Sequence, residues 1–228
     1  MDRFFNMDNK FFAFMGKVAD LIIVNLLCLA CCIPIVTAGA SITALYYVTM
    51  KMVRNEESYI VKSFFKSFKE NFKQATIIHL IMLATGLILF LDLTIVRNAT
   101  GGMYRVLFCI FVAFALLYAM LLLYIYPVLA KFYNTIRNTF TNSFLMAIRH
   151  LPFTILMLAF WIIPVLILFI PDVRIQSTLI MLFFMFGFSS IAYGQSFFFR
   201  KIFDHYIPKE AEEEPAPEES LPDSGDTV

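Results

Sequence analysis

Residues 106–130 read VLFCIFVAFALLYAMLLLYIYPVLA, an uncharged apolar run as long as a membrane-spanning helix. A bilayer core of roughly 30 Å takes about 20 helical residues at about 1.5 Å each. Comparable uncharged runs cover residues 151–171 and 175–199. Helices are the expected spanning elements, because an isolated strand leaves its backbone groups without hydrogen bonds in lipid. The sequence therefore predicts an all-α, polytopic transmembrane helical bundle.

The composition of the whole chain supports a membrane protein. Hydrophobic residues make up 60% of the 228 residues and charged residues only 15%, and a water-facing globule of this size could not bury so many apolar side chains. We assign residues 1–207 to a transmembrane domain. Residues 208–228 hold eight acidic side chains and one lysine and are rich in Glu, Pro and Ser, so we predict a disordered acidic tail.

The number of spans depends on residues 18–53, where two short apolar runs meet at Pro34. A single span followed by a surface helix gives five spans in all, and a tight hairpin gives six. The positive-inside rule favours six spans with both termini in the cytoplasm, because 15 of the 18 basic residues then lie inside. A re-entrant loop would give the same orientation and stays open. The preferred arrangement is three hairpins, with spans at about 18–33, 35–53, 75–96, 104–128, 151–171 and 175–199.

Two linking segments, about 58–73 and 131–149, have the pattern of interfacial amphipathic helices. In the first, apolar and basic side chains occupy opposite faces at helical spacing. The candidate interface with lipid or a partner protein consists of Phe64, Phe65, Phe68, Phe72, Lys62, Lys66, Lys69 and Lys73. Lysines on such a helix meet anionic lipid headgroups. The second segment carries a similar stripe and is either separate from the preceding span or continuous with it.

Polar side chains inside predicted spans are candidates for function, because they are costly in lipid. These positions are Asp20, Asn25, Thr37, Asp92 and Gln195. Asp20 near Lys17, and Asp92 near Arg97, also fit ion pairs at headgroup level. Gln195 lies in a tract of small residues where helices pack closely, so its amide is expected to form hydrogen bonds between helices.

The sequence carries no motif of enzyme chemistry. It lacks a Gly-rich phosphate loop, a paired-His zinc motif and a nucleophile elbow. Cys28 and Cys31 are spaced C-x-x-C within an apolar run, where core packing explains them better than redox chemistry does. We therefore expect a protein that is not an enzyme, with no catalytic, cofactor-binding or metal-binding residues.

One long stretch resembles a known family. Residues 31–75, CCIPIVTAGASITALYYVTMKMVRNEESYIVKSFFKSFKENFKQA, are similar to the YesL family of bacterial membrane proteins, a domain of unknown function. The resemblance implies a multi-pass protein of the bacterial cytoplasmic membrane. Because family members are encoded beside carbohydrate ABC importers and two-component sensors, it implies an accessory role in sugar uptake. It also implies that residues 34–39, with Asn71 and Phe72, deserve the first tests.

Two functions from different classes follow. The first is a non-enzymatic accessory or scaffold protein of a bacterial carbohydrate ABC uptake or sensing system, with a sugar permease or a sensor kinase as its partner. The alternative is a small-solute channel or carrier, with a path past Asn25, Thr37, Ser41 and Gln195. Membrane lipid is an expected partner and nucleic acid is not, and a homo-oligomer is left open.

Overall fold

The computed structural model describes residues 10–56, 59–99 and 101–206, and every regular element in this part of the chain is a helix. The elements are α1 (Lys10–Cys32), η1 (Ile35–Thr37), α2 (Ala38–Arg54), α3 (Ile60–Asn98), α4 (Gly102–Lys131), α5 (Ile136–Arg149), α6 (Leu151–Ala159), α7 (Ile162–Leu168), α8 (Val173–Leu182), η2 (Phe183–Gly187) and α9 (Phe188–Asp204). The predicted all-α fold is confirmed. The predicted acidic tail, 208–228, and the expected helix start at Ser58 lie outside the described residues.

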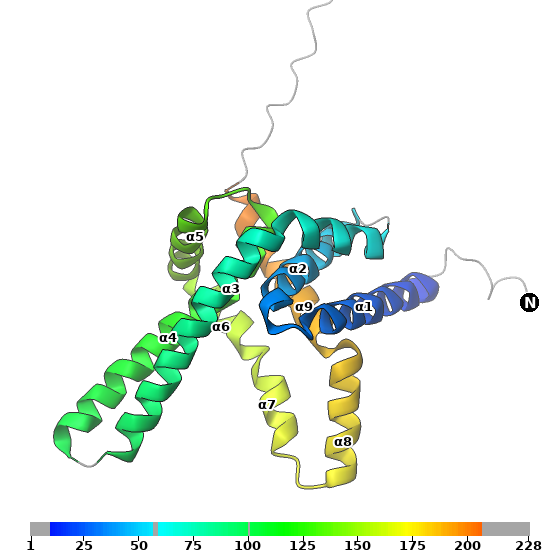
Figure 1. Ribbon diagram of the computed structural model, residues 1–228. Coiled ribbons are helices and arrows are strands. Elements are labelled where there is room, and N and C mark those ends of the chain that lie inside the picture. Colours follow the sequence, from blue (N-terminus) through cyan, green and yellow to red (C-terminus); the bar gives the residue numbers. More distant parts are fainter. Residues whose placement is uncertain (1–9, 57–58, 100, 207–228) are drawn as a thin grey trace, which may run out of the picture.

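Two long hairpins extend to the same side of the molecule, one made by α3 and α4 and the other by α7 and α8 (Figure 1). Their tips lie far from α5 and from the end of α9 (Figure 1). Most large apolar side chains on these hairpins are exposed. Since such surfaces are unfavourable in water, lipid is their natural environment.

Five segments of the described chain are long and apolar enough to cross a membrane: Phe14–Cys32, Ile60–Asn98, Gly102–Lys131, Leu151–Leu168 and Val173–Asp204. Helix α2, which corresponds to the predicted span 35–53, has 17 residues and is not among them. It lies instead in the centre of the bundle, in contact with α1, α3, α4 and α9. The structure thus gives five candidate spans around a short internal helix.

Helix α2 reaches its central position through a close crossing with α3. A Cβ atom added at Gly39 would lie 2.5 Å from His79 Cβ and 2.6 Å from the carbonyl oxygen of Ala75. Only glycine fits that space without a shift of the α3 backbone. At its other end α2 stops at Arg54, because Asn55 adopts a left-handed conformation with φ of 54°.

The segments predicted as an interfacial helix at about 58–73 and a span at about 75–96 belong to one continuous helix. Helix α3 runs unbroken for 39 residues from Ile60 to Asn98, and no glycine or proline stands near residue 74 to end it. At about 1.5 Å per residue it is roughly 58 Å long, nearly twice a bilayer core. Its amphipathic first half and its apolar second half are therefore parts of one helix.

The segment predicted at 131–149 is separate from the span before it. Helix α4 ends at Lys131, residues 132–135 form a short linker, and α5 begins at Ile136. The Thr135 side chain caps α5 by accepting a hydrogen bond from the backbone N–H of Asn138 at 3.3 Å.

The last two predicted spans are interrupted helices. Residues 151–171 break at Phe160 and Trp161, just before Pro164. Because Pro164 has no N–H, the carbonyl oxygen of Phe160 accepts from Ile163 N instead, at 3.4 Å. Residues 175–199 contain a π-helical turn, η2, between α8 and α9. Pro127, by contrast, lies within α4 without ending it.

Candidate functional site

The predicted lysine face of α3 is present and open. Lys62, Lys66, Lys69 and Lys73 are all exposed, and we refer to these four residues as the α3 lysine face. Lys66 forms an ion pair with Glu70, with 4.0 Å between Nζ and Oε1. Exposed pairs of this kind contribute little stability. The four ammonium groups are therefore available to anionic lipid or to an acidic partner surface.

The phenylalanines predicted for the same interface divide into buried and exposed ones. Phe64 is fully buried and stacks on Phe68, which is itself partly buried, with ring centroids 6.3 Å apart. Phe64 therefore belongs to the core and is not available to a partner, which corrects the prediction. Phe65 and Phe72 are 39% and 40% exposed and provide the accessible apolar part of this surface.

Gln195 joins three helices through its side-chain amide. Its Nε2 donates to the carbonyl oxygen of Met157 in α6 at 3.0 Å. Its Oε1 accepts from the Tyr46 hydroxyl of α2 at 2.5 Å. Gln195 is fully buried, so the interhelical hydrogen bonding expected from its small neighbours is confirmed.

Asn25 of α1 binds both edges of the π-helical turn. Its Nδ2 donates to the carbonyl oxygen of Phe184 at 2.7 Å, and its Oδ1 accepts from the backbone N–H of Ser189 at 2.9 Å. A π-turn disturbs the regular i to i+4 pairing, and the side chain supplies the missing partners. The position of Asn25 is thus explained by helix packing.

The other predicted intramembrane positions lie apart from one another. The Thr37 hydroxyl donates to the carbonyl oxygens of Cys31 and Pro34, at 2.6 and 2.8 Å, and so closes the turn between α1 and α2. Asp20 is half-buried on α1, and Lys17 donates to Asn55 Oδ1 at 2.8 Å. Asp92 is half-buried on α3 and, among the described residues, forms no ion pair with Arg97. These residues do not form one site.

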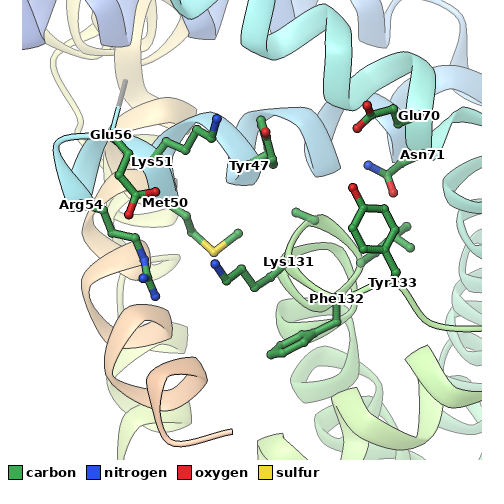
Figure 2. Close-up of a pocket in the computed structure, with 12 residues that line it drawn as sticks. Tyr47, Met50, Lys51, Arg54, Glu56, Glu70, Asn71, Lys131, Phe132 and Tyr133 are labelled. Atoms are coloured by element: carbon green, nitrogen blue, oxygen red, sulfur yellow. The ribbon is translucent and has the colours of Figure 1, made fainter. Parts of the chain in front are cut away.

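A cleft of about 220 Å³ lies where the ends of α2 and α4 meet α3. Figure 2 shows its side chains around one open space, with Lys51, Arg54 and Glu56 on one side and Glu70, Asn71 and Tyr133 on the other. Lys131 and Phe132, from the end of α4 and the following linker, lie between these two groups (Figure 2). We call this space the α2–α4 cleft. It combines cations, carboxylates, an amide and aromatic rings, which suits binding of a polar ligand.

The cleft was not among the sequence predictions. Its residues come from three segments far apart in the chain, and single basic residues at the ends of helices are ordinary features of membrane proteins. The one available signal was that Lys51 and Lys131 both follow apolar runs on the predicted cytoplasmic side. In the described residues, no three His, Cys, Asp or Glu side chains gather as a metal site.

The fold and the apolar surfaces define the class: this is a polytopic helical membrane protein. Residues 21–93 match the family described as "Protein of unknown function, DUF624". The chain is 32% identical over 105 residues to "Uncharacterized protein YesL" of Bacillus subtilis (strain 168), a match covering 46% of this chain and 49% of that protein. The resemblance to the YesL family is therefore confirmed.

A second relative of the same organism is "Uncharacterized protein YteU", 25% identical over 117 residues, which cover 51% of this chain and 52% of that protein. The chain thus spans about half the length of the curated relatives it matches. No solved structure gives a significant match.

Proposed function

We propose that the protein is a non-enzymatic accessory or scaffold subunit in the bacterial cytoplasmic membrane, serving a carbohydrate ABC uptake or sensing system. The observation that carries the scaffold part is the surface of α3, where the α3 lysine face adjoins exposed Phe65 and Phe72. A basic surface with aromatic anchors is suited to docking on another protein. The link to carbohydrate uptake is supported by the resemblance to the YesL family alone.

The charge distribution supports an orientation with both termini in the cytoplasm. Five candidate spans are compatible with it, because α2 returns the chain to the side where α1 starts: Lys17 of α1 donates to Asn55 Oδ1 at the end of α2, at 2.8 Å. Arg97, Arg105 and Arg174 lie at the tips of the α3–α4 and α7–α8 hairpins. The other basic residues of the described helices lie on α1, on α2 and in the first half of α3. They also lie from the end of α4 through α5, and at the end of α9. Since cytoplasmic loops carry the excess of Lys and Arg, the hairpin tips would face outward.

The packing of the polar core argues against the alternative, a channel or carrier. Asn25, Ser41 and Gln195 are fully buried and bonded to backbone or side chains of neighbouring helices. A solute path lined by these groups would require those hydrogen bonds to break, leaving polar atoms unsatisfied in a low-dielectric interior.

Affinity capture from membranes in mild detergent tests the scaffold proposal. The tagged full-length chain is co-expressed with a carbohydrate ABC permease and a sensor kinase from the same genome. We expect one of them to be recovered, and K62Q/K69Q to reduce recovery several-fold. The matched control, R137Q/K201Q, removes two exposed cations elsewhere and should recover the partner normally. Recovery of the tagged chain alone would argue against the proposal.

A further inference from the structure

We propose that the α2–α4 cleft binds a phosphate group, carried either by an anionic phospholipid headgroup or by a small soluble phosphate compound. This site is distinct from the α3 lysine face and does not depend on the scaffold role. The inference comes from the charges in the cleft, its size and its place at the end of a membrane helix.

The charges that line the cleft are mixed, with three cations, Lys51, Arg54 and Lys131, against two carboxylates, Glu56 and Glu70. Arg54 pairs with Asp204 and Glu70 pairs with Lys66, and both of these partners lie outside the lining of the cleft. The lysines left are Lys51 and Lys131. Glu56 is exposed at the margin, where water screens its charge.

The two lysines are held in different ways. Lys51 Nζ lies 4.8 Å from the centroid of the Tyr47 ring, which restrains it against the wall of α2. Lys131 is half-buried and, within the part of the chain that the structure describes, forms no hydrogen bond or ion pair. A partly desolvated ammonium gains most from a charged acceptor. An anion between α2 and α4 would provide one.

The size of the cleft and the neighbouring donors suit a phosphate group. The volume of about 220 Å³ is far above the roughly 10–15 Å³ that a single water needs, which leaves room for a phosphate with a short polar substituent. Tyr133 lines the cleft yet is 95% exposed. Its hydroxyl is thus free to donate a hydrogen bond to a phosphate oxygen.

The place of the cleft suits a lipid headgroup in particular. Lys131 is the last residue of a candidate membrane span, so its ammonium is expected near the boundary between hydrocarbon and water. Basic pockets between helices at this level bind anionic headgroups. A soluble phosphate compound would reach the same cleft from the aqueous side.

Native mass spectrometry of the full-length protein tests the lipid source. The protein in detergent is offered equal amounts of phosphatidylglycerol and phosphatidylcholine. We expect retained phosphatidylglycerol to exceed phosphatidylcholine, and K51Q/K131Q to lower its retention about tenfold or more. The control R137Q/K201Q should retain it as the wild type does.

A thermal-shift assay with glycerol phosphate tests the soluble source. A rise in the melting temperature of the wild type that K51Q/K131Q abolishes assigns the cleft to a soluble phosphate compound. The conservative K131R should keep the binding of whichever ligand the wild type takes. If K51Q/K131Q melts well below the wild type without ligand, the single K131Q replaces it.

The proposal fails if the wild type retains no excess of phosphatidylglycerol and is not stabilised by glycerol phosphate. It also fails if the cleft variants bind these ligands as well as R137Q/K201Q does. That result would leave the scaffold role untouched, because partner capture is tested through Lys62 and Lys69. Loss of partner capture with intact phosphate binding would argue against the scaffold role and leave the phosphate site supported.

Discussion

Asn25 Nδ2 donates a hydrogen bond to the carbonyl oxygen of Phe184 at 2.7 Å, so a side chain of α1 stabilises an irregular turn far along the chain. Its Oδ1 accepts from Ser189 N at 2.9 Å on the other side of that turn. The same amide therefore replaces two backbone partners that a regular helix would supply. This explains a buried asparagine in an apolar span without recourse to a ligand.

Replacing Asn25 by leucine should destabilise the protein more than an ordinary polar-to-apolar change does. The substitution keeps a similar volume but leaves the carbonyl of Phe184 and the N–H of Ser189 unsatisfied, at about 1–3 kcal/mol each. Thermal unfolding in detergent measures the effect. The control is Asn138→Leu on α5, where the side chain is exposed. Equal melting temperatures for the two variants would contradict the role given to Asn25.

Gln195 and Tyr46 should be energetically coupled. Tyr46→Phe removes the hydroxyl that donates to Gln195 Oε1, and Gln195→Met removes the acceptor together with the bond to Met157. A double-mutant cycle should give a coupling free energy of about 0.5–1.5 kcal/mol. Additive effects of the two substitutions would show that the 2.5 Å contact contributes nothing to stability.

Gly39→Ala should be strongly destabilising for a single methyl group. The added Cβ would meet His79 Cβ at 2.5 Å and the backbone oxygen of Ala75 at 2.6 Å, so α2 and α3 must move apart. Overpacking of this kind costs about 1–3 kcal/mol. Gly16→Ala is the matched control, since nothing lies within 4 Å of its added Cβ. In helix α1 that change should be neutral or stabilising by up to about 1 kcal/mol. Unfolding midpoints that rank the two variants in reverse order would refute the close-packing argument.

The membrane helices were predictable because lipid imposes a length and a composition on each span. Helix α4, Gly102–Lys131, contains the whole predicted span 104–128. The lysine face between Lys62 and Lys73 was predictable for a similar reason, since helical spacing alone separates the basic from the apolar side chains.

The unbroken α3 could not be predicted from the same pattern. The change near residue 74 from an amphipathic to an apolar sequence indicates that the helix passes from the membrane surface into lipid. The helix itself continues, because nothing there interrupts helical hydrogen bonding. The contacts of Asn25 and the α2–α4 cleft likewise depend on tertiary packing. Lys51 and Lys131 stand at the ends of apolar runs in the sequence, but no sequence pattern indicates that the end of α2 and the end of α4 lie together.

Stability should fall on acidification through His150, which lies between α5 and α6, outside the candidate spans. Its pKa is lowered from the ordinary value of about 6.5 by partial burial first and then by the nearby His205 and Arg149. The folded state therefore binds this proton less readily than the unfolded state. The stability contributed by neutral His150 is present above pH 6.5 and is lost as the pH falls from there towards the lower folded pKa.

Melting temperatures in detergent between pH 7.5 and 5 measure this loss. The variant His150→Gln keeps a side chain able to hydrogen-bond the Tyr206 hydroxyl, which lies 3.1 Å from Nε2 of the histidine, but it does not titrate. Its melting temperature should fall less steeply with pH than that of the wild type. A wild-type slope retained in full by the variant would assign the pH dependence to other groups, because the glutamine removes only the titrating ring.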